Sequence, residues 1–260
     1  MQELVMMFLI CLVSFSASIL TFFSGFGLGT MLLPVFSLFM PIELAVLATA
    51  IVHILNNTLK FVLIRNFIDK GILISFGITA IIGAFIGAMI QKYLGSGGVA
   101  YKVDILNGQH SVELLSAVVG VLMIVFAILD LIPLLKRISF GNGQFFAGGL
   151  LSGLFGGLSG HQGALRAAFL AKSNLSAEVF IATSVCVSLL IDAVRIPVYF
   201  SSDNGGIENN WLIISLACFF AFTGSIIGKR IFIKKKVKNI RILVAVFLFI
   251  MGTGMVLGVV

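Results

Sequence analysis

Long apolar stretches, separated by short polar or Gly/Pro-containing segments, make up nearly the whole 260-residue chain. We delimit eight such runs, with approximate bounds 4–39, 43–65, 71–93, 112–135, 143–172, 176–200, 209–229 and 240–260. A bilayer core of roughly 30 Å is crossed by about 20 apolar residues in a helix. The pattern therefore predicts an all-α integral membrane protein with about eight transmembrane helices.

Composition supports this prediction and excludes several other classes. Hydrophobic residues make up 60% of the chain and charged residues 10%, whereas a soluble domain carries about 25% charged residues. The formal net charge of +7 comes from basic residues beside apolar runs, which indicates membrane orientation and no nucleic acid partner. Cys11, Cys186 and Cys218 lie far apart within apolar runs, so we expect no disulfide, no metal site and no cofactor.

The first and fifth runs are too long for a straight crossing at 1.5 Å per residue, and each has glycines in its middle. They are Gly25, Gly27 and Gly29, followed by Pro34, and Gly153, Gly156, Gly157, Gly160 and Gly163. Glycines of this kind also serve close helix packing, but their matching places in the chain favour two broken helices around a midplane site. A half-helix N-terminus there would favour an anion. No strand precedes Gly25, which argues against a dinucleotide site.

The chain contains an internal repeat. A shift of 135 residues places Glu43 on Glu178, Asn57 on Asp192 and Lys60 on Arg195, and a shift of 141 places Gly83-x-x-x-Gly87 on Gly224-x-x-x-Gly228. We therefore expect a single membrane transporter domain, 1–260, built from two four-helix halves of approximately 1–137 and 138–260. An even number of crossings per half predicts parallel repeats, related by an axis along the membrane normal.

The distribution of basic residues predicts an orientation. They crowd the segment between the last two runs, namely Lys229, Arg230, Lys234, Lys235, Lys236, Lys238 and Arg241, so we expect this segment in the cytoplasm. With eight crossings both termini would then lie outside. Arg65, Lys70, Lys136 and Arg137 would lie outside as well, so the positive-inside rule is obeyed only on balance.

Two polar stripes follow one face of a helix within apolar runs. The second run carries Thr49, His53, Asn56, Asn57 and Lys60, and the sixth carries Ser184, Ser188, Asp192 and Arg195. Ionisable residues within membrane spans usually face a cavity and mark function. Two structural alternatives remain open: Asp192 would pair with Arg195 on the same helix, and Lys60 would reach the membrane interface.

The fifth run holds the most polar cluster at membrane depth, Ser159-Gly160-His161-Gln162-Gly163, followed by Arg166. A guanidinium group suits bidentate binding of an oxyanion, and a salt bridge between helices is the alternative for Arg166. His161 would bind substrate, relay a proton or hydrogen-bond the broken helix.

These motifs resemble the TauE/SafE sulfite-exporter family over nearly the whole chain. The resemblance lies in Gly25-Phe26-Gly27-Leu28-Gly29 with Pro34, Pro41 and Thr49, in Gly157-Leu158-Ser159-Gly160-His161-Gln162-Gly163-Ala164-Leu165-Arg166, and in Ala182-Thr183. It implies two related four-helix halves and a permease for sulfite, sulfoacetate or other small sulfur-containing or organic anions. His161 and Gln162 stand where the family usually has glycines, so the chain resembles a divergent Ser-Gly-His-Gln-Gly subgroup whose substrate stays open.

The leading hypothesis is a secondary transporter that moves a small anion across the cytoplasmic membrane by alternating access. Its partners would be the lipid bilayer and the anion, and a homo-oligomer is compatible with the sequence. The substrate-binding candidates are Arg166, His161, Gln162, Ser159, Gly25, Gly27, Gly160, His53 and Asn57, and the ion-coupling candidates are Asp192, His53 and His161. The alternatives are a passive anion channel, a membrane scaffold, and an intramembrane serine protease. A protease would use Ser159 with His53 as its base, because His161 is expected to point to another face.

Overall fold

Helices account for most of the computed structural model, which describes residues 2–24, 27–105, 108–131, 144–170, 175–202, 206–232 and 240–260. They are α1 (Gln2–Ser24), α2 (Leu28–Ser37), α3 (Ile42–Ile64), α4 (Lys70–Gly95), α5 (Leu114–Leu131), α7 (Phe145–Ser159), α8 (Gln162–Leu170), α9 (Ala177–Phe200), α10 (Trp211–Phe232) and α11 (Ile240–Val256). By length and composition, α1, α3, α4, α9 and α10 can each cross a membrane. The chain is therefore a multi-pass helical membrane protein, as predicted.

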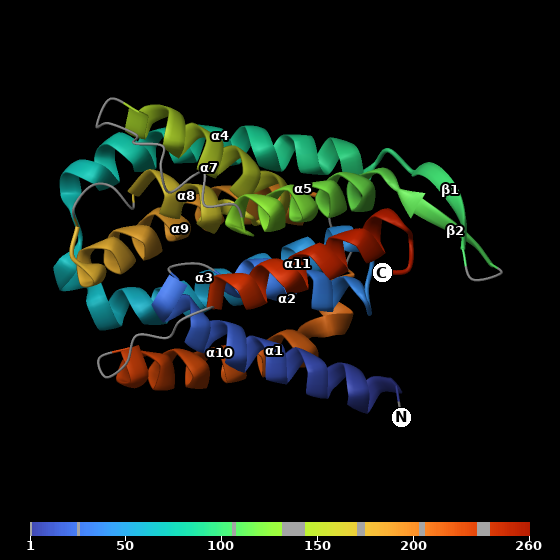
Figure 1. Ribbon diagram of the computed structural model, residues 1–260, viewed down its shortest axis with the longest axis horizontal. Helices are drawn as coiled ribbons and strands as arrows, with labels where there is room; N and C mark the ends of the chain where they lie inside the picture. The colour runs from blue at the N-terminus through green and yellow to red at the C-terminus, as the bar shows by residue number, and fades with distance from the viewer. Residues whose placement is uncertain are drawn as a thin grey trace.

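A β-hairpin that the sequence analysis did not predict projects from one end of the helices (Figure 1). Strand β1 (Val99–Ile105) pairs antiparallel with β2 (Gly108–Glu113), so that Ile105 lies opposite Gly108. The hydroxyl of Tyr101 donates a hydrogen bond to the carbonyl of Val256, 2.7 Å away, at the end of α11. Both chain termini also lie at this end, which we call the hairpin end.

The first long run folds back on itself. Helix α1 begins at the hairpin end (Figure 1), and α2 also ends there, because Ser37 and Met40 share a hollow with Val112 of β2. Gly27, which precedes α2, has φ = 135°, a conformation that side chains with a Cβ rarely adopt. The predicted interruption is thus present, but the run enters and leaves at one end instead of crossing once.

The fifth run folds back from the opposite end. Gly160 has φ = 79° and closes α7, and α8 then runs back along α7. A Cβ on Gly156 would lie 2.9 Å from Cβ of Gln162, and one on Gly148 would lie 2.5 Å from Phe169. Residues further from the break on α7 therefore contact residues further from the break on α8, as in an antiparallel pair.

The expectation of parallel repeats is wrong. By the 135-residue shift α3 corresponds to α9, yet the two helices run in opposite directions: Glu43 and Leu47 near the start of α3 share a hollow with Tyr199 near the end of α9. His53 and Asp192 meet where the helices cross. Because the corresponding helices α3 and α9 are antiparallel, the two halves are inverted relative to each other.

Helices α4 and α7 run in the same direction and pack closely along glycines. A Cβ on Gly149, Gly153 or Gly157 would approach the backbone oxygen of Phe76, Ala80 or Ala84, respectively, to between 2.1 and 2.3 Å. Only residues without a side chain permit such close backbone approach, which is the usual way in which helices associate within membranes. This contact holds the tip of the second folded-back pair against the rest of the molecule.

The two ends of the molecule differ in charge. Lys229 Nζ donates to the carbonyl of Leu63, 3.2 Å away, so the ends of α3 and α10 lie together with Arg65, Lys70 and Arg230 nearby in the chain. We call this the basic end, where Asp69 and Glu178 are the acidic residues near the starts of α4 and α9. The hairpin end carries acidic residues, namely Glu43, Asp104, Glu113 and Glu208, beside Lys92 and Lys102. The prediction that Arg65 and Lys70 lie opposite Lys229 is therefore wrong.

Candidate functional site

The tips of the two folded-back pairs meet in the middle of the protein. A Cβ on Gly29 would lie 3.5 Å from the carbonyl oxygen of Gly160 and 3.6 Å from Cδ2 of His53. A cavity of about 20 Å³ lies between the tips, lined by Thr21, Gly27, Gly29, Thr30, His53, Gly160, Gln162, Gly163, Arg166, Val185 and Ser188. We call it the central cavity. Its volume is enough for about one water molecule.

Helices α2 and α8 both begin at the central cavity. Gly29 and Thr30 belong to the first turn of α2, and Gln162 and Gly163 to the first turn of α8. The first N–H groups of a helix have no partner within it, and they carry the positive end of the helix dipole. Two such ends directed at one cavity favour an anion there.

Arg166 adds a full positive charge on the side of α8. The guanidinium group is buried, and its NH1 donates to the hydroxyl of Ser188 at 2.7 Å and to Oε1 of Gln162 at 3.4 Å. The amide nitrogen of Gln162 is also buried and makes no hydrogen bond with any side chain or backbone group that the structure describes. An arginine and an amide donor on one helix turn suit recognition of an oxyanion.

An ionic network behind the cavity joins the two halves. Nδ1 of His53 lies 2.6 Å from Oδ2 of Asp192, and Arg195 contacts Oδ1 of the same carboxylate through Nε at 2.9 Å and NH2 at 2.8 Å. Asp192 thus pairs with Arg195, one of the alternatives that the sequence left open, and also with His53 from the other half. Arg195 NH1 further donates to the carbonyl of Gly156 at 3.1 Å, where a cation offsets the negative end of α7.

Lys60 does not reach the interface. The side chain is 1% exposed, and it lies between helices in a second polar cluster with Asn56, Ser18 and Ser225. When the amide of Asn56 is oriented to satisfy its neighbours, its oxygen accepts from Lys60 Nζ at 3.2 Å and from Ser18 Oγ at 3.2 Å. Ser18 and Ser225 are hydrogen-bonded at 2.7 Å. This cluster joins α1, α3 and α10.

The structure brings some of the predicted site residues to the central cavity and places others behind it. Gly27, His53, Gly160, Gln162 and Arg166 line the cavity. Asn57 lies behind His53, with Nδ2 3.2 Å from the ring Nδ1. Gly25 lies outside the described residues.

Ser159 and His161 are not part of the cavity lining, and His161 faces helix α5. The His161 ring stacks on Phe126, with centroids 5.9 Å apart, and its Nδ1 lies 3.0 Å from Ser159 Oγ. The expectation that these two residues point to different faces is therefore wrong. Ser159 is nevertheless 1% exposed and donates to the carbonyl of Phe155. A catalytic base in a serine protease triad is usually oriented by a third group on its other ring nitrogen. His161 Nε2 has no hydrogen-bond partner within the described part of the chain, so no described group plays that role.

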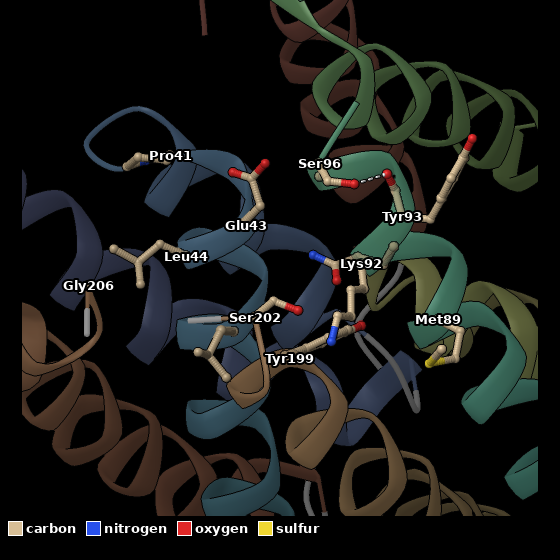
Figure 2. Close-up of a pocket in the computed structure, with 13 residues that line it drawn as sticks. Pro41, Glu43, Leu44, Met89, Lys92, Tyr93, Ser96, Tyr199, Ser202 and Gly206 are labelled. Atoms are coloured by element: carbon tan, nitrogen blue, oxygen red, sulfur yellow. Dashed lines mark hydrogen bonds between the residues drawn. The ribbon is translucent and has the colours of Figure 1, made fainter. Parts of the chain in front are cut away.

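Sequence reasoning missed several lining residues and a large hollow. Thr21 and Thr30 line the central cavity without belonging to either polar stripe; the place of Thr30 beside Gly29 was the available signal. A hollow of about 760 Å³ at the hairpin end, which we call the vestibule, is lined by Pro41, Glu43, Leu44, Leu47, Met89, Gln91, Lys92, Tyr93, Gly95, Ser96, Tyr199, Ser202 and Gly206 (Figure 2). Its residues come from α3, α4 and α9 and from the turns beside them, which meet only in the fold.

Comparison with models of known protein families gives a match. A family model described as Sulfite exporter TauE/SafE matches residues 10–255, which include both helix tips and all the lining residues of the central cavity. A search of curated proteins and a search of solved structures each found no match.

Proposed function

Because the chain belongs to the TauE/SafE family of membrane permeases, we propose that it is a secondary transporter of a small anion across the cytoplasmic membrane. The anion would be sulfite, an organosulfonate, or a related sulfur-containing or carboxylate anion. The observation that carries this proposal is the meeting of two helix N-termini and Arg166 at the central cavity. The family match supports a role in transport rather than in catalysis.

The charges around the cavity support an anionic substrate. In the part of the chain that the structure describes, Asp192 is the one buried acidic side chain, whereas Lys60, Arg166 and Arg195 are buried basic side chains. Arg195 contacts Asp192 directly, so that carboxylate is already shared with one cation and with His53. A bound anion would interact favourably with Arg166 and with the two helix N-termini, since charges within a membrane are stabilised by opposite charges.

Alternating access is supported by the size of the cavity and by the arrangement of the halves. A cavity with room for about one water molecule cannot hold a sulfur oxyanion unless the tips separate. The contact of Gly29 with Gly160 and the His53–Asp192 pair both join the two halves, so a relative movement of the halves would open the site. His53 and Asp192 are our candidates for ion coupling, with His161 a third. Ser159, His161 and Asn57 would support the lining residues from behind.

The charge difference between the ends supports an orientation. Positively charged residues gather on the cytoplasmic side of membrane proteins, so we place the basic end, with Arg65, Lys70, Lys229 and Arg230, in the cytoplasm. The vestibule and both described chain ends then face outward.

Transport assays with purified protein in liposomes test the proposal. We expect saturable uptake and counterflow of at least one anion from a set that includes sulfite, organosulfonates and small carboxylates. Arg166→Gln should lower the apparent affinity roughly 10- to 100-fold, because a hydrogen bond to a charged group contributes about 1.5–3 kcal/mol. Arg65→Gln, at an exposed arginine of the basic end, is the matched control.

Three outcomes would contradict the proposal. Flux of every tested anion equal to that of empty liposomes would remove the transport function. Flux without saturation or counterflow would indicate a passive channel. Equal affinities of the Arg166→Gln and Arg65→Gln proteins would remove Arg166 from the site.

A further inference from the structure

The vestibule is an open hollow of the size that holds small ligands. Its volume of about 760 Å³ lies within the range of roughly 300–1,000 Å³ typical of ligand pockets. Lys92 lies in it, with Nζ 3.0 Å from Ser201 Oγ, and Glu43 lies on the facing helix. The vestibule thus offers a path inward from the hairpin end, with Lys92 and Glu43 on a lining that is otherwise largely apolar.

Tyr199 closes the inner side of the vestibule. It lines the vestibule but is only 3% exposed, whereas Tyr93, which also lines it, is 75% exposed and points away from Lys92 and Tyr199 (Figure 2). The Tyr199 hydroxyl donates a hydrogen bond to the carbonyl of Gly157. Gly157 lies in the last turn of α7, so this bond fixes α9 against the tip of a folded-back pair.

A continuous series of contacts leads from Tyr199 to the central cavity. The guanidinium group of Arg195, one turn earlier on α9, lies 5.8 Å from the centre of the Tyr199 ring. Arg195 NH1 would lie 3.0 Å from a Cβ on Gly160, which lines the cavity. Tyr199 and Arg195, one turn apart on the same face of α9, therefore lie between the vestibule and the central cavity.

At the basic end, the start of α9 corresponds to the start of α3 at the vestibule, but it is arranged differently. The 135-residue shift places Glu43 on Glu178 and Leu47 on Ala182, near the start of α9. There the backbone N–H of Asp69 donates to Thr183 Oγ1 at 3.0 Å, which ties the start of α9 to the turn before α4. One end of the molecule is hollowed as far as Tyr199, and the equivalent helix start at the other end is held by a direct contact.

On the basis of the proposed transport function, we propose that this structure is an occluded state whose vestibule opens toward the hairpin end, and that Tyr199 is the closed gate between the vestibule and the central cavity. Opening the gate breaks the bond from Tyr199 to Gly157 and moves Arg195 away from the tip of α7. Tyr199 acts through the position of this tip and is a positioning residue.

Thiol labelling in oriented membrane vesicles tests the gate without knowledge of the substrate. Cys11, Cys186 and Cys218 are replaced by serine, and single cysteines are introduced as Ser96→Cys at the rim or Thr30→Cys in the cavity. A membrane-impermeant methanethiosulfonate reagent should label Ser96→Cys rapidly from one face, which identifies the hairpin end. Tyr199→Ala should raise the labelling rate of Thr30→Cys roughly tenfold from that face, since a closing hydrogen bond is lost. Tyr93→Ala is the matched control and should leave the rate unchanged.

The outcomes separate the gate from a loosened fold and from transport itself. An unchanged Thr30→Cys rate in the Tyr199→Ala protein, or equal acceleration from both faces or by Tyr93→Ala, overturns the gate. If Tyr199→Ala does not fold, Tyr199→Phe keeps the ring, and acceleration from the hairpin end is expected; no acceleration overturns the proposal. Acceleration from that face alone in a protein that transports no anion supports the gate and refutes the transport function. Retained transport with unchanged labelling refutes the gate alone.

Discussion

Asp192→Asn removes the negative charge from the centre of the ionic network while keeping the shape of the side chain. In the native protein this carboxylate is fully buried and contacts His53 at 2.6 Å and Arg195 at 2.8 and 2.9 Å. Removal of one partner of a buried ion pair costs about 3–5 kcal/mol, because the other charge is left uncompensated. An asparagine oxygen still accepts from Arg195 Nε, so we expect the lower part of this range.

The free energy of unfolding is measured by titration with a denaturing detergent in mixed micelles. Glu178→Gln, at an exposed acid on the same helix, is the control and should cost less than about 1 kcal/mol, the usual contribution of a charge at a helix N-terminus. In the double variant Asp192→Asn with Arg195→Gln the two losses should not add, because the second change removes the uncompensated charge. Additive losses, or a loss no larger than that of Glu178→Gln, would refute the role of Asp192 as the shared counter-charge.

Two further predictions concern packing and the basic end, and each is measured as the free energy of unfolding. Gly153→Ala should destabilise the protein by about 1–3 kcal/mol, because the new Cβ would approach the Ala80 oxygen to 2.1 Å and force α4 and α7 apart. The control is Gly71→Ala, at an exposed helical position of α4, which should be neutral or stabilising. Equal losses of stability in both variants would contradict the close-packed interface. Thr183→Val should cost about 1 kcal/mol of stability by removing the acceptor of the Asp69 N–H. The control is Thr58→Val, because the Thr58 hydroxyl is exposed and bonds to Ile54 of its own helix. Equal stability of the two variants would mean that the Asp69 contact does not hold the basic end.

Apolar runs predicted the helices well because helix bounds depend on local sequence. The runs 43–65 and 176–200 agree with α3 and α9 to within a few residues, and Gly160 breaks the fifth run as expected. The β-hairpin was missed because a hydrophobic scan treats 94–111 only as a gap. Alternating Val99, Tyr101, Val103 and Ile105, followed by Asn107-Gly108, were the available signal for two strands and a tight turn.

Periodicity could predict which side chains share a face, but not what lies opposite that face. The stripes correctly grouped His53 with Asn57, and Asp192 with Arg195. The contact between His53 and Asp192 depends on how α3 and α9 cross, which no spacing within one helix contains. The contact of His161 with Ser159 follows from the left-handed conformation of Gly160 between them, since a continuous helix would have directed the two side chains to different faces.

One error in counting crossings explains two mismatches of the sequence analysis. A run of 36 residues with glycines in its middle is compatible with a broken crossing and with a folded-back pair, because both have the same composition and length. Interpretation of each such run as a single crossing led us to expect parallel halves, and it placed Arg65 and Lys70 on the side opposite Lys229. In the folded-back arrangement α3 and α10 end together, and Lys229 contacts the carbonyl of Leu63, two residues before Arg65. The same inversion directs the N-termini of α2 and α8 toward one cavity from opposite ends, so the charge distribution at the surface and the anion preference at the centre have a common topological cause.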